Sequence, residues 1–247
     1  MRVVATYSIK GGVGKTSTAV NLAAVAALEG RRVLLWDLDP QGAAGYLLEV
    51  KGKVKGGSLG LLTGDRDLGD AVRTTAVDGL HVLPADVSGR AADAALEDAK
   101  RPVKQLARVL KSVRSDYDVL ILDCPPGLSL LSQNVFAAVD LLLVPLVPTP
   151  LSVRTLEQLQ DFLATVDGAG PAVHPFFSMV DGRKRLHADV RAELMRHTTR
   201  ILTAWVPAAT AVERMALTHA PLALTAPTDP VTQAYRELWA EISGLLS

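Results

Sequence analysis

A glycine- and lysine-rich segment near the N-terminus constrains the fold of this 247-residue chain more than any other feature. A run of β-branched and apolar residues, Arg2–Tyr7, precedes it, and an apolar helical pattern, Lys15–Leu28, begins within it. A strand, a glycine-rich turn and a helix in this order aim backbone N–H groups and the positive end of the helix at one place. The pattern therefore predicts a binding site for phosphate groups, formed by Lys10-Gly11-Gly12-Val13-Gly14-Lys15-Thr16-Ser17.

The residue types of this segment suit a nucleoside triphosphate and its magnesium ion. Glycines at three positions let the backbone curl without Cβ clashes. We expect Lys15 to reach the β- and γ-phosphates and the Thr16 hydroxyl to ligate Mg²⁺. The alternative is a plain glycine turn between a strand and a helix. The predicted ligands are ATP and Mg²⁺, with the nucleotide contacted by Gly11, Gly12, Val13, Gly14, Lys15, Thr16 and Ser17.

Short β-branched runs alternate with helical patterns along the rest of the chain. The continuous apolar run Asp118–Asp123 is typical of a strand that is buried on both faces. This alternation predicts a single α/β domain over residues 1–247, with a mostly parallel, twisted β-sheet flanked by helices. We expect further strands at Arg32–Trp36, Leu80–Pro84, Leu141–Val147 and Val173–Val180, helices at Pro102–Val113 and Val231–Leu246, and a flexible surface loop at Lys51–Gly64.

Composition and charge limit the classes of protein to which this chain can belong. A formal net charge of zero argues against general affinity for polyanions, although it leaves room for a local basic patch. The single cysteine, Cys124, provides neither a disulfide framework nor a set of cluster ligands, which favours a cytoplasmic protein. The chain shows no secretory signal pattern and no apolar stretch suited to crossing a bilayer, so we expect no stable membrane association.

Acidic residues follow two of the predicted strands. Asp37 and Asp39 come after Arg32–Trp36, at the edge where parallel sheets bind their ligands. Asp123 ends the most apolar strand, and in a chain with a phosphate loop such an acid is expected to hold Mg²⁺ through water. The structural alternatives are a turn cap by Asp39 before Pro40 and a strand-end cap by Asp123.

Three strings, KGGVGKTS, DLDPQG and DCPPGL, resemble the ParA and MinD group of ATPases. The ordinary phosphate-loop pattern has glycine where this chain has Ile9, and a second lysine inside the loop, Lys10, resembles the deviant Walker A family. The resemblance implies that Lys10 crosses a dimer interface to the partner's nucleotide and assists catalysis beside Lys15. It also implies that Asp39 orients the attacking water and that Asp37 lies near the Mg²⁺ shell.

Looser similarities extend the resemblance over nearly the whole chain. Phe177–Asp181 and Val206-Pro207 look like adenine-side segments of ParA proteins, which makes Met179 and Pro207 expected nucleotide contacts. The chain is most similar to small, Soj-like ParA proteins, because it lacks the cysteines of nitrogenase-type reductases and its last helix lacks the basic amphipathic pattern of MinD. A dethiobiotin-synthetase-like ATP-dependent ligase and a MinD-like membrane-associated regulator remain the alternatives.

A local excess of positive charge suggests a DNA-binding surface. Between Arg183 and Arg200 the chain has six Lys or Arg and two acidic residues, a net charge of +4 in a neutral protein. Arg196 and Arg200 are four residues apart on a predicted helix, and the expected DNA contacts are Arg191, Arg196 and Arg200. Contacts to the phosphate backbone alone would be insensitive to base sequence. The alternative is a merely solvated helix face.

Together these features predict a ParA-like ATPase that forms an ATP-bound homodimer and binds nucleoid DNA without sequence preference. We expect a ParB-like or other adaptor protein to stimulate hydrolysis, so that the system segregates or positions a plasmid, a chromosome or a protein assembly such as a carboxysome. The expected location is the cytoplasm, in association with the nucleoid.

Overall fold

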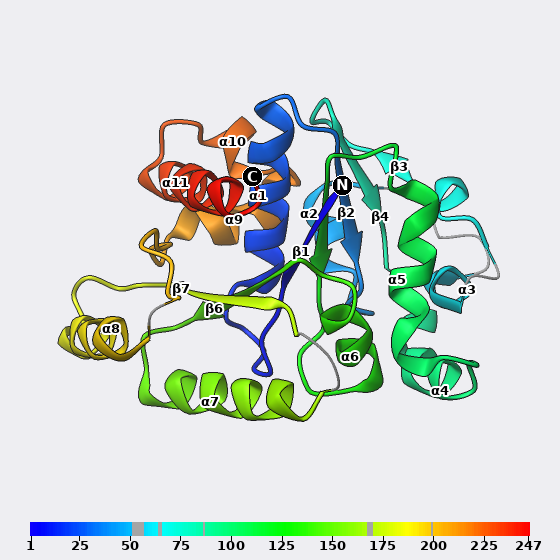
Figure 1. Cartoon of the computed structure of the whole chain (residues 1–247). Coiled ribbons are helices and arrows are strands. Elements are labelled where there is room, and N and C mark those ends of the chain that lie inside the picture. Colours follow the sequence, from blue (N-terminus) through cyan, green and yellow to red (C-terminus); the bar gives the residue numbers. More distant parts are fainter. Residues whose placement is uncertain (51–56, 64–65, 86, 167–169, 199) are drawn as a thin grey trace.

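The computed structural model describes the chain apart from residues 51–56, 64–65, 86, 167–169 and 199. Within the described residues, one seven-stranded sheet has the order β3-β4-β2-β5-β1-β6-β7 (Figure 1). All neighbouring strands in it pair in parallel except β3 and β4. The strands are β1 (Arg2–Thr6), β2 (Val33–Asp37), β3 (Arg73–Thr74), β4 (Leu80–Leu83), β5 (Val119–Asp123), β6 (Leu141–Leu146) and β7 (Ala172–Phe177).

Helices cover both faces of this sheet, so the predicted α/β class is confirmed. The α-helices are α1 (Lys15–Leu28), α2 (Ala43–Leu47), α3 (Gly57–Thr63), α4 (Ala92–Glu97), α5 (Gln105–Val109), α6 (Leu130–Phe136), α7 (Pro150–Thr165), α8 (Arg185–His197), α9 (Thr210–Thr218), α10 (Leu222–Thr225) and α11 (Pro230–Leu245). Short 3₁₀ segments are η1 (Gly69–Ala71), η2 (Val87–Ala91), η3 (Pro102–Lys104) and η4 (Leu110–Val113).

Two hydrophobic layers lie on opposite faces of the sheet. Successive side chains of β2 enter different layers, because consecutive residues of a strand point to opposite faces of the sheet. Leu34 and Trp36 pack with buried residues of α5, α6 and α7. Leu35 packs instead with α1 and α11, whose apolar faces form the second layer. The central strands β2 and β5 are buried at every position, which explains their unbroken apolar sequences.

The sequence located these elements with uneven accuracy. Helix α1 has the predicted bounds, and the helical stretch predicted at Pro102–Val113 forms as η3, α5 and η4 in succession. The loop predicted at Lys51–Gly64 is wrong for Gly57–Thr63, which form α3 with Leu61 and Leu62 buried in the first layer. Residues 51–56 and 64 of that predicted loop lie outside the described residues.

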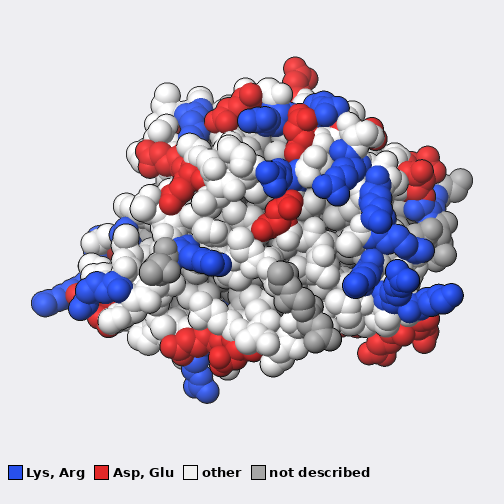
Figure 2. Space-filling view, viewed as in Figure 1, with Lys and Arg blue, Asp and Glu red and all other residues white. Residues whose placement is uncertain are grey.

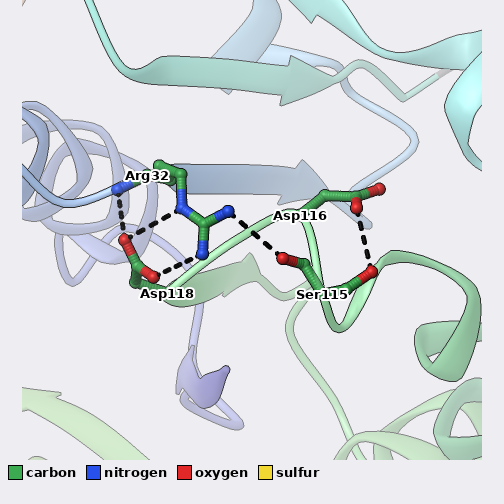
Figure 3. Close-up of polar contacts among 4 residues, drawn as sticks. All are labelled: Arg32, Ser115, Asp116 and Asp118. Atoms are coloured by element: carbon green, nitrogen blue, oxygen red, sulfur yellow. Dashed lines mark hydrogen bonds and ion pairs between the residues drawn. The ribbon is translucent and has the colours of Figure 1, made fainter.

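An exposed ion pair joins the beginnings of β2 and β5 (Figure 3). The Arg32 guanidinium donates to both carboxylate oxygens of Asp118, at 2.7 and 3.3 Å, and to the Ser115 carbonyl at 3.1 Å. The Arg32 backbone N–H donates to the same carboxylate at 2.9 Å. The pair lies at one end of the two strands, and in their parallel register Asp37 and Asp123 are partners at the other end.

Candidate functional site

The phosphate loop links the carboxyl end of β1 to the start of α1. Gly12 and Gly14 have φ of 72° and 91°, in the left-handed region that favours glycine. A Cβ on Gly14 would lie 2.9 Å from the Ser178 hydroxyl oxygen, so a side chain here would also have to displace that hydroxyl. Gly14 is the N-cap of α1 and has no side chain that could cover the first amides of the helix. This end of α1 is therefore suited to bind an anion.

Lys15 is buried at the centre of this loop, only 7% exposed. Its Nζ donates to the Lys10 carbonyl oxygen at 3.3 Å. Burial lowers the pKa of the Lys15 ammonium, while the nearby carboxylates of Asp123 and Asp39 act in the opposite direction. A buried cation next to free helix amides can neutralise phosphate charge at short range. The sequence assigned this role to Lys15, and its position is suited to it.

Lys10 differs from Lys15 because its side chain is exposed. Its backbone N–H donates to the Ser8 hydroxyl at 3.3 Å, which holds the loop while the side chain lies in solvent. A cation presented outward from the rim of the phosphate loop is free to reach a group on another molecule.

Two carboxyl groups are adjacent and fully buried where β2 and β5 end. Asp37 and Asp123 are partners in the parallel register of these strands. Burial is the main cause that raises the pKa of Asp37, to about 8, and proximity to the second carboxyl adds to it. Burial likewise raises the pKa of Asp123, to about 7, although Thr16 and Lys15 act in the opposite direction. Such a pair favours binding of either protons or a cation.

Asp37 has a structural function that the sequence did not reveal. One of its oxygens accepts hydrogen bonds from the Ala44 and Gly45 amides, at 3.0 and 3.4 Å, at the start of α2. The other accepts from the Asp39 amide at 3.1 Å. Asp37 therefore organises the loop that carries Asp39, and its predicted place near the Mg²⁺ shell stays a prediction.

Asp123 is the better candidate for a magnesium site. Its Oδ2 atom is buried, and within the described residues it accepts no hydrogen bond, whereas Oδ1 is 3.5 Å from the Thr6 hydroxyl. The nearby Thr16 hydroxyl lowers the pKa of Asp123. A threonine hydroxyl beside an unsatisfied carboxylate oxygen matches the oxygen ligands and bound waters that Mg²⁺ prefers. Thr16 and Asp123 therefore provide oxygen ligands of the kind that a magnesium ion requires.

Asp39 lies on the turn that follows β2 and is partly exposed. Its Oδ1 accepts the Gln41 amide at 3.0 Å, so the turn cap considered from the sequence is present. The side chain still lies near enough to influence the pKa of Lys15 and of Asp123. Asp39 is therefore the one carboxylate of the three that is both next to the phosphate loop and accessible to solvent.

The two predicted adenine-side segments meet beside the phosphate loop. Val180 pairs with Pro207 in a parallel bridge, and the Ala208 amide donates to the Val180 carbonyl at 3.0 Å. Met179 is 42% exposed and adopts a positive φ of 54°. The hydroxyl of its neighbour Ser178 lies beside the loop at Gly14, a proximity that no residue spacing predicted. The structure thus brings Met179 and Pro207 into one region with the loop.

The predicted DNA-binding residues do not share one helix. Helix α8 ends at His197, so the expected placement of Arg196 and Arg200 on one helical face is wrong. Thr198, which follows the helix, has an extended backbone with φ of −125°. Arg196 forms an ion pair with Glu193.

Arg191 contacts aromatic side chains. Its guanidinium is stacked 4.6 Å from the ring centroid of Trp205 and 5.5 Å from that of Phe177. Burial lowers the pKa of this group. Two of the three predicted contacts, Arg191 and Arg196, are therefore already engaged within the protein.

Cys124 follows Asp123 and is completely inside the protein. It is 1% exposed, and burial raises the pKa of its thiol well above the ordinary value. These surroundings agree with a packing role and not with a nucleophile. Among the described helices, none combines the length and apolar character needed to cross a bilayer.

Comparisons with known sequences show which proteins this chain resembles. A family model described as an AAA domain matches residues 1–170. The chromosome-partitioning ATPase Soj of Thermus thermophilus is 35% identical over a match covering 98% of this chain and 95% of that protein. The sporulation initiation inhibitor protein Soj of Bacillus subtilis is 39% identical over a match covering 67% of this chain and 64% of that protein.

Solved structures share the fold over almost the full length. Cobyrinic acid a,c-diamide synthase from Mycobacterium smegmatis, with bound ADP and magnesium, aligns with a TM-score of 0.83 and 28% identity over 97% of this chain and 93% of that chain. Apo McdA from Cyanthece aligns with a TM-score of 0.87 over 98% and 99% of the two chains. At 20% identity, the second likeness shows the fold alone.

Proposed function

Because the chain belongs to the Soj and ParA family of partitioning ATPases, we propose that it forms an ATP-bound dimer that binds DNA and releases it after hydrolysis. DNA would be bound without sequence preference, and the cycle would segregate or position a cargo. ATP and Mg²⁺ are its ligands, and the M. smegmatis relative holds ADP and magnesium on the same fold. The observation that best supports the proposal is an exposed Lys10 on the rim of a phosphate loop that already contains a buried Lys15.

In this proposal the residues of the site have separate roles in the transfer of a phosphate group from ATP to water. The amides at the start of α1 and Lys15 hold the phosphates and offset the charge that grows on them. Thr16 and Asp123 would hold Mg²⁺, which neutralises phosphate charge when bound. Asp39 is partly exposed beside them and would orient the attacking water. Met179 and Pro207 would contact the base.

Dimerisation would place Lys10 against the partner's nucleotide. An ammonium supplied from a second subunit acts only when two nucleotide-bound subunits meet, so hydrolysis becomes coupled to assembly. A ParB-like or other adaptor would accelerate the step, and DNA binding would place the protein on the nucleoid. Plasmids, chromosomes and protein assemblies such as carboxysomes are all suitable cargoes for this cycle.

Co-sedimentation with DNA tests the proposal directly. We expect the full chain to bind a random-sequence duplex with ATP and Mg²⁺, and not with ADP or without nucleotide. The Lys10→Ala variant should bind ATP yet remain monomeric and off DNA. Equal DNA binding with ATP and ADP, or none with ATP at low salt, would contradict the proposed cycle.

A second candidate is an ATP-dependent ligase, favoured by the 28% identity to the diamide synthase structure. In that case ATP turnover would depend on a small carboxylic acid and would not respond to DNA. The single cysteine is buried, so this chain offers no accessible thiol for releasing ammonia from glutamine. Measuring ATP turnover with DNA, and separately with small carboxylic acids, distinguishes the two candidates.

A further inference from the structure

A stripe of positive charge outside the nucleotide site has the strongest claim to a binding function. Between Asp98 and Asp116 the chain contains six Lys or Arg and no carboxylate, a local net charge of +6. All six are exposed. Figure 2 shows the corresponding blue group on the side of the molecule where Figure 1 places α5. We call this surface the α5 stripe; it consists of Lys100, Arg101, Lys104, Arg108, Lys111 and Arg114.

The stripe follows one face of a continuous helical segment. Its last five members recur at intervals of three or four residues, which aligns them on one side across η3, α5 and η4. The opposite side carries buried residues such as Leu106, Val109 and Leu110. The segment is therefore anchored in the core through its apolar face, and its charged face is held in a fixed position.

The charges of the stripe are uncompensated, unlike those of the α8 segment. In the described part of the chain, none of the six takes part in an ion pair. Near α8, Arg183 pairs with Asp181 at 3.0 Å, Arg185 approaches Asp189 at 3.9 Å and Arg196 pairs with Glu193. A polyanion at α8 would compete with these carboxylates for the arginines, whereas the α5 stripe has no such competitor among the described residues.

We propose that the α5 stripe is the principal surface through which this protein holds the phosphate backbone of duplex DNA. The inference rests on the proposed DNA binding and names the surface responsible for it. From Arg101 to Arg114 the segment spans roughly 20 Å at ~1.5–2 Å per residue. One DNA strand presents a phosphate about every 3.4 Å along the helix axis, so five or six cations over this length can each meet one.

Other anionic partners fit the stripe less well. A helix that lies on a membrane inserts large apolar side chains beneath its cations. Of the exposed large apolar residues in the described chain, none falls between residues 98 and 116, and the apolar face of the segment is already buried. An acidic protein would need an aromatic or aliphatic anchor at the centre of its interface. A row of cations without such an anchor matches a regular phosphate backbone.

Matched charge-removal variants test the inference. The stripe variant combines Lys100→Gln, Lys104→Gln and Lys111→Gln, and spares Arg108, which donates to the Thr63 carbonyl. The control removes the same charge near α8 through Arg185→Gln, Arg196→Gln and Arg200→Gln. Binding of the full-length proteins to a random-sequence duplex is measured by fluorescence anisotropy with ATP and Mg²⁺ over a series of salt concentrations. Thermal unfolding and ATP-dependent dimerisation are recorded for each protein.

We expect the stripe variant to bind DNA at least tenfold more weakly than wild type while still forming the ATP-bound dimer. The slope of log affinity against log salt should fall by roughly 0.9 for each lost contact, and the control should stay near wild type. The three corresponding Lys→Arg changes should retain binding, which separates charge from packing. If the triple variant is unstable, Lys104→Gln and Lys111→Gln tested singly should each lower the slope by about 0.9.

Three results would overturn the inference in distinguishable ways. Loss of DNA binding in the α8 control, but not in the stripe variant, would reject the α5 stripe and leave the proposed function intact. Failure of wild type to bind DNA with ATP would reject the proposed function together with the inference. Stripe-dependent binding to anionic phospholipid vesicles, without binding to DNA, would identify a membrane as the partner instead.

Discussion

Lys10 and Lys15 lie in one loop, but their surroundings differ. Lys15 is buried beside Asp123 and donates within the loop, whereas Lys10 is exposed at its rim. A buried ammonium can act only on a nucleotide bound in the same subunit. An exposed one gains a partner only when another surface approaches, and this difference makes the two lysines separable by experiment.

Replacing each lysine by alanine should separate nucleotide binding from assembly. We expect Lys15→Ala to weaken ATP binding by two orders of magnitude or more, since a buried charge-assisted contact worth about 3 kcal/mol is lost. Lys10→Ala should bind ATP like wild type but fail to dimerise. Calorimetry with ATP and sedimentation velocity measure the two properties. ATP-dependent dimerisation of Lys10→Ala at wild-type level would contradict the role across the interface.

Asp39 should affect turnover more than binding. It is the partly exposed carboxylate of the site, and its Oδ1 accepts the Gln41 amide of its own turn. We expect Asp39→Ala to bind ATP and dimerise yet hydrolyse at least tenfold more slowly, because the water is no longer oriented. Asp39→Asn retains the turn cap and serves as the control for loop structure. Single-turnover hydrolysis at the wild-type rate would shift the water-orienting role to another residue.

At the scale of elements, helix α1 connects the phosphate loop to the C-terminal helices through Asn21. This buried amide donates to the Ser17 carbonyl at 2.8 Å and accepts from the Leu222 amide, at the start of α10, at 2.9 Å. Its side-chain nitrogen also donates to the Met215 sulfur, on α9, at 3.3 Å. One side chain thus joins α1, α9 and α10.

The change Asn21→Ala should destabilise the protein by about 1–3 kcal/mol, because the buried Leu222 amide loses its acceptor. Gln233→Ala on the exposed side of α11 is the control and should change stability by about 0.5 kcal/mol or less. Urea denaturation of the nucleotide-free proteins measures both values. An Asn21→Ala variant as stable as wild type would show that water replaces the lost contacts.

The elements that the sequence predicted well are those whose signal is local. Helix α1 is preceded by the glycines that place its first turn, and β5 is an uninterrupted apolar strand. Helix α7 was not predicted, although Thr149 and Pro150 form a typical helix start. The end of α8 and the contact of Ser178 with Gly14 depend on tertiary packing, so residue spacing could not supply them.

The site was predictable to a similar extent. The phosphate loop and both acidic strand ends follow from motifs, and the parallel register brings Asp37 and Asp123 together as expected of neighbouring strand ends. That Asp37 organises α2 was not predictable, because its partners are backbone amides seven and eight residues later. The α5 stripe was visible in the sequence as a run without acids, but its alignment on one face required the structure.

At the scale of the whole molecule, the net charge is zero, but positively and negatively charged groups gather in different places. The α5 stripe holds six cations on the surface, while Asp37 and Asp123 are buried together at the site. The buried pair couples folding to protons and metal ions, since two carboxylates in a low-dielectric site cannot both ionise without cost. Binding of ATP and Mg²⁺ would then stabilise the fold as well as complete the site.

This coupling predicts an unusual dependence of stability on pH. Burial raises the pKa of Asp37 to about 8 and that of Asp123 to about 7, whereas both are near 3.9 in the unfolded chain. The folded protein therefore retains protons that the unfolded chain releases. The stability that these protons provide is fully present below about pH 4 and is lost as the pH rises towards 8.

Urea denaturation of the nucleotide- and metal-free protein at pH 6.0, 7.0 and 8.0 should show an unfolding free energy that falls with pH. The slope can reach about 1.4 kcal/mol per pH unit for each retained proton. Asp123→Asn should flatten this decline, because one buried carboxyl no longer ionises and its neighbour loses the repulsion. Asp118→Asn, at the exposed ion pair with Arg32, is the matched control and should leave the decline in place.

Saturating ATP and Mg²⁺ should reduce the decline of the unfolding free energy in wild type by neutralising the ionised pair of carboxylates. A wild-type stability that rises between pH 6 and 8, or an Asp123→Asn variant that declines as steeply, would show that the buried carboxyls ionise without cost to the fold.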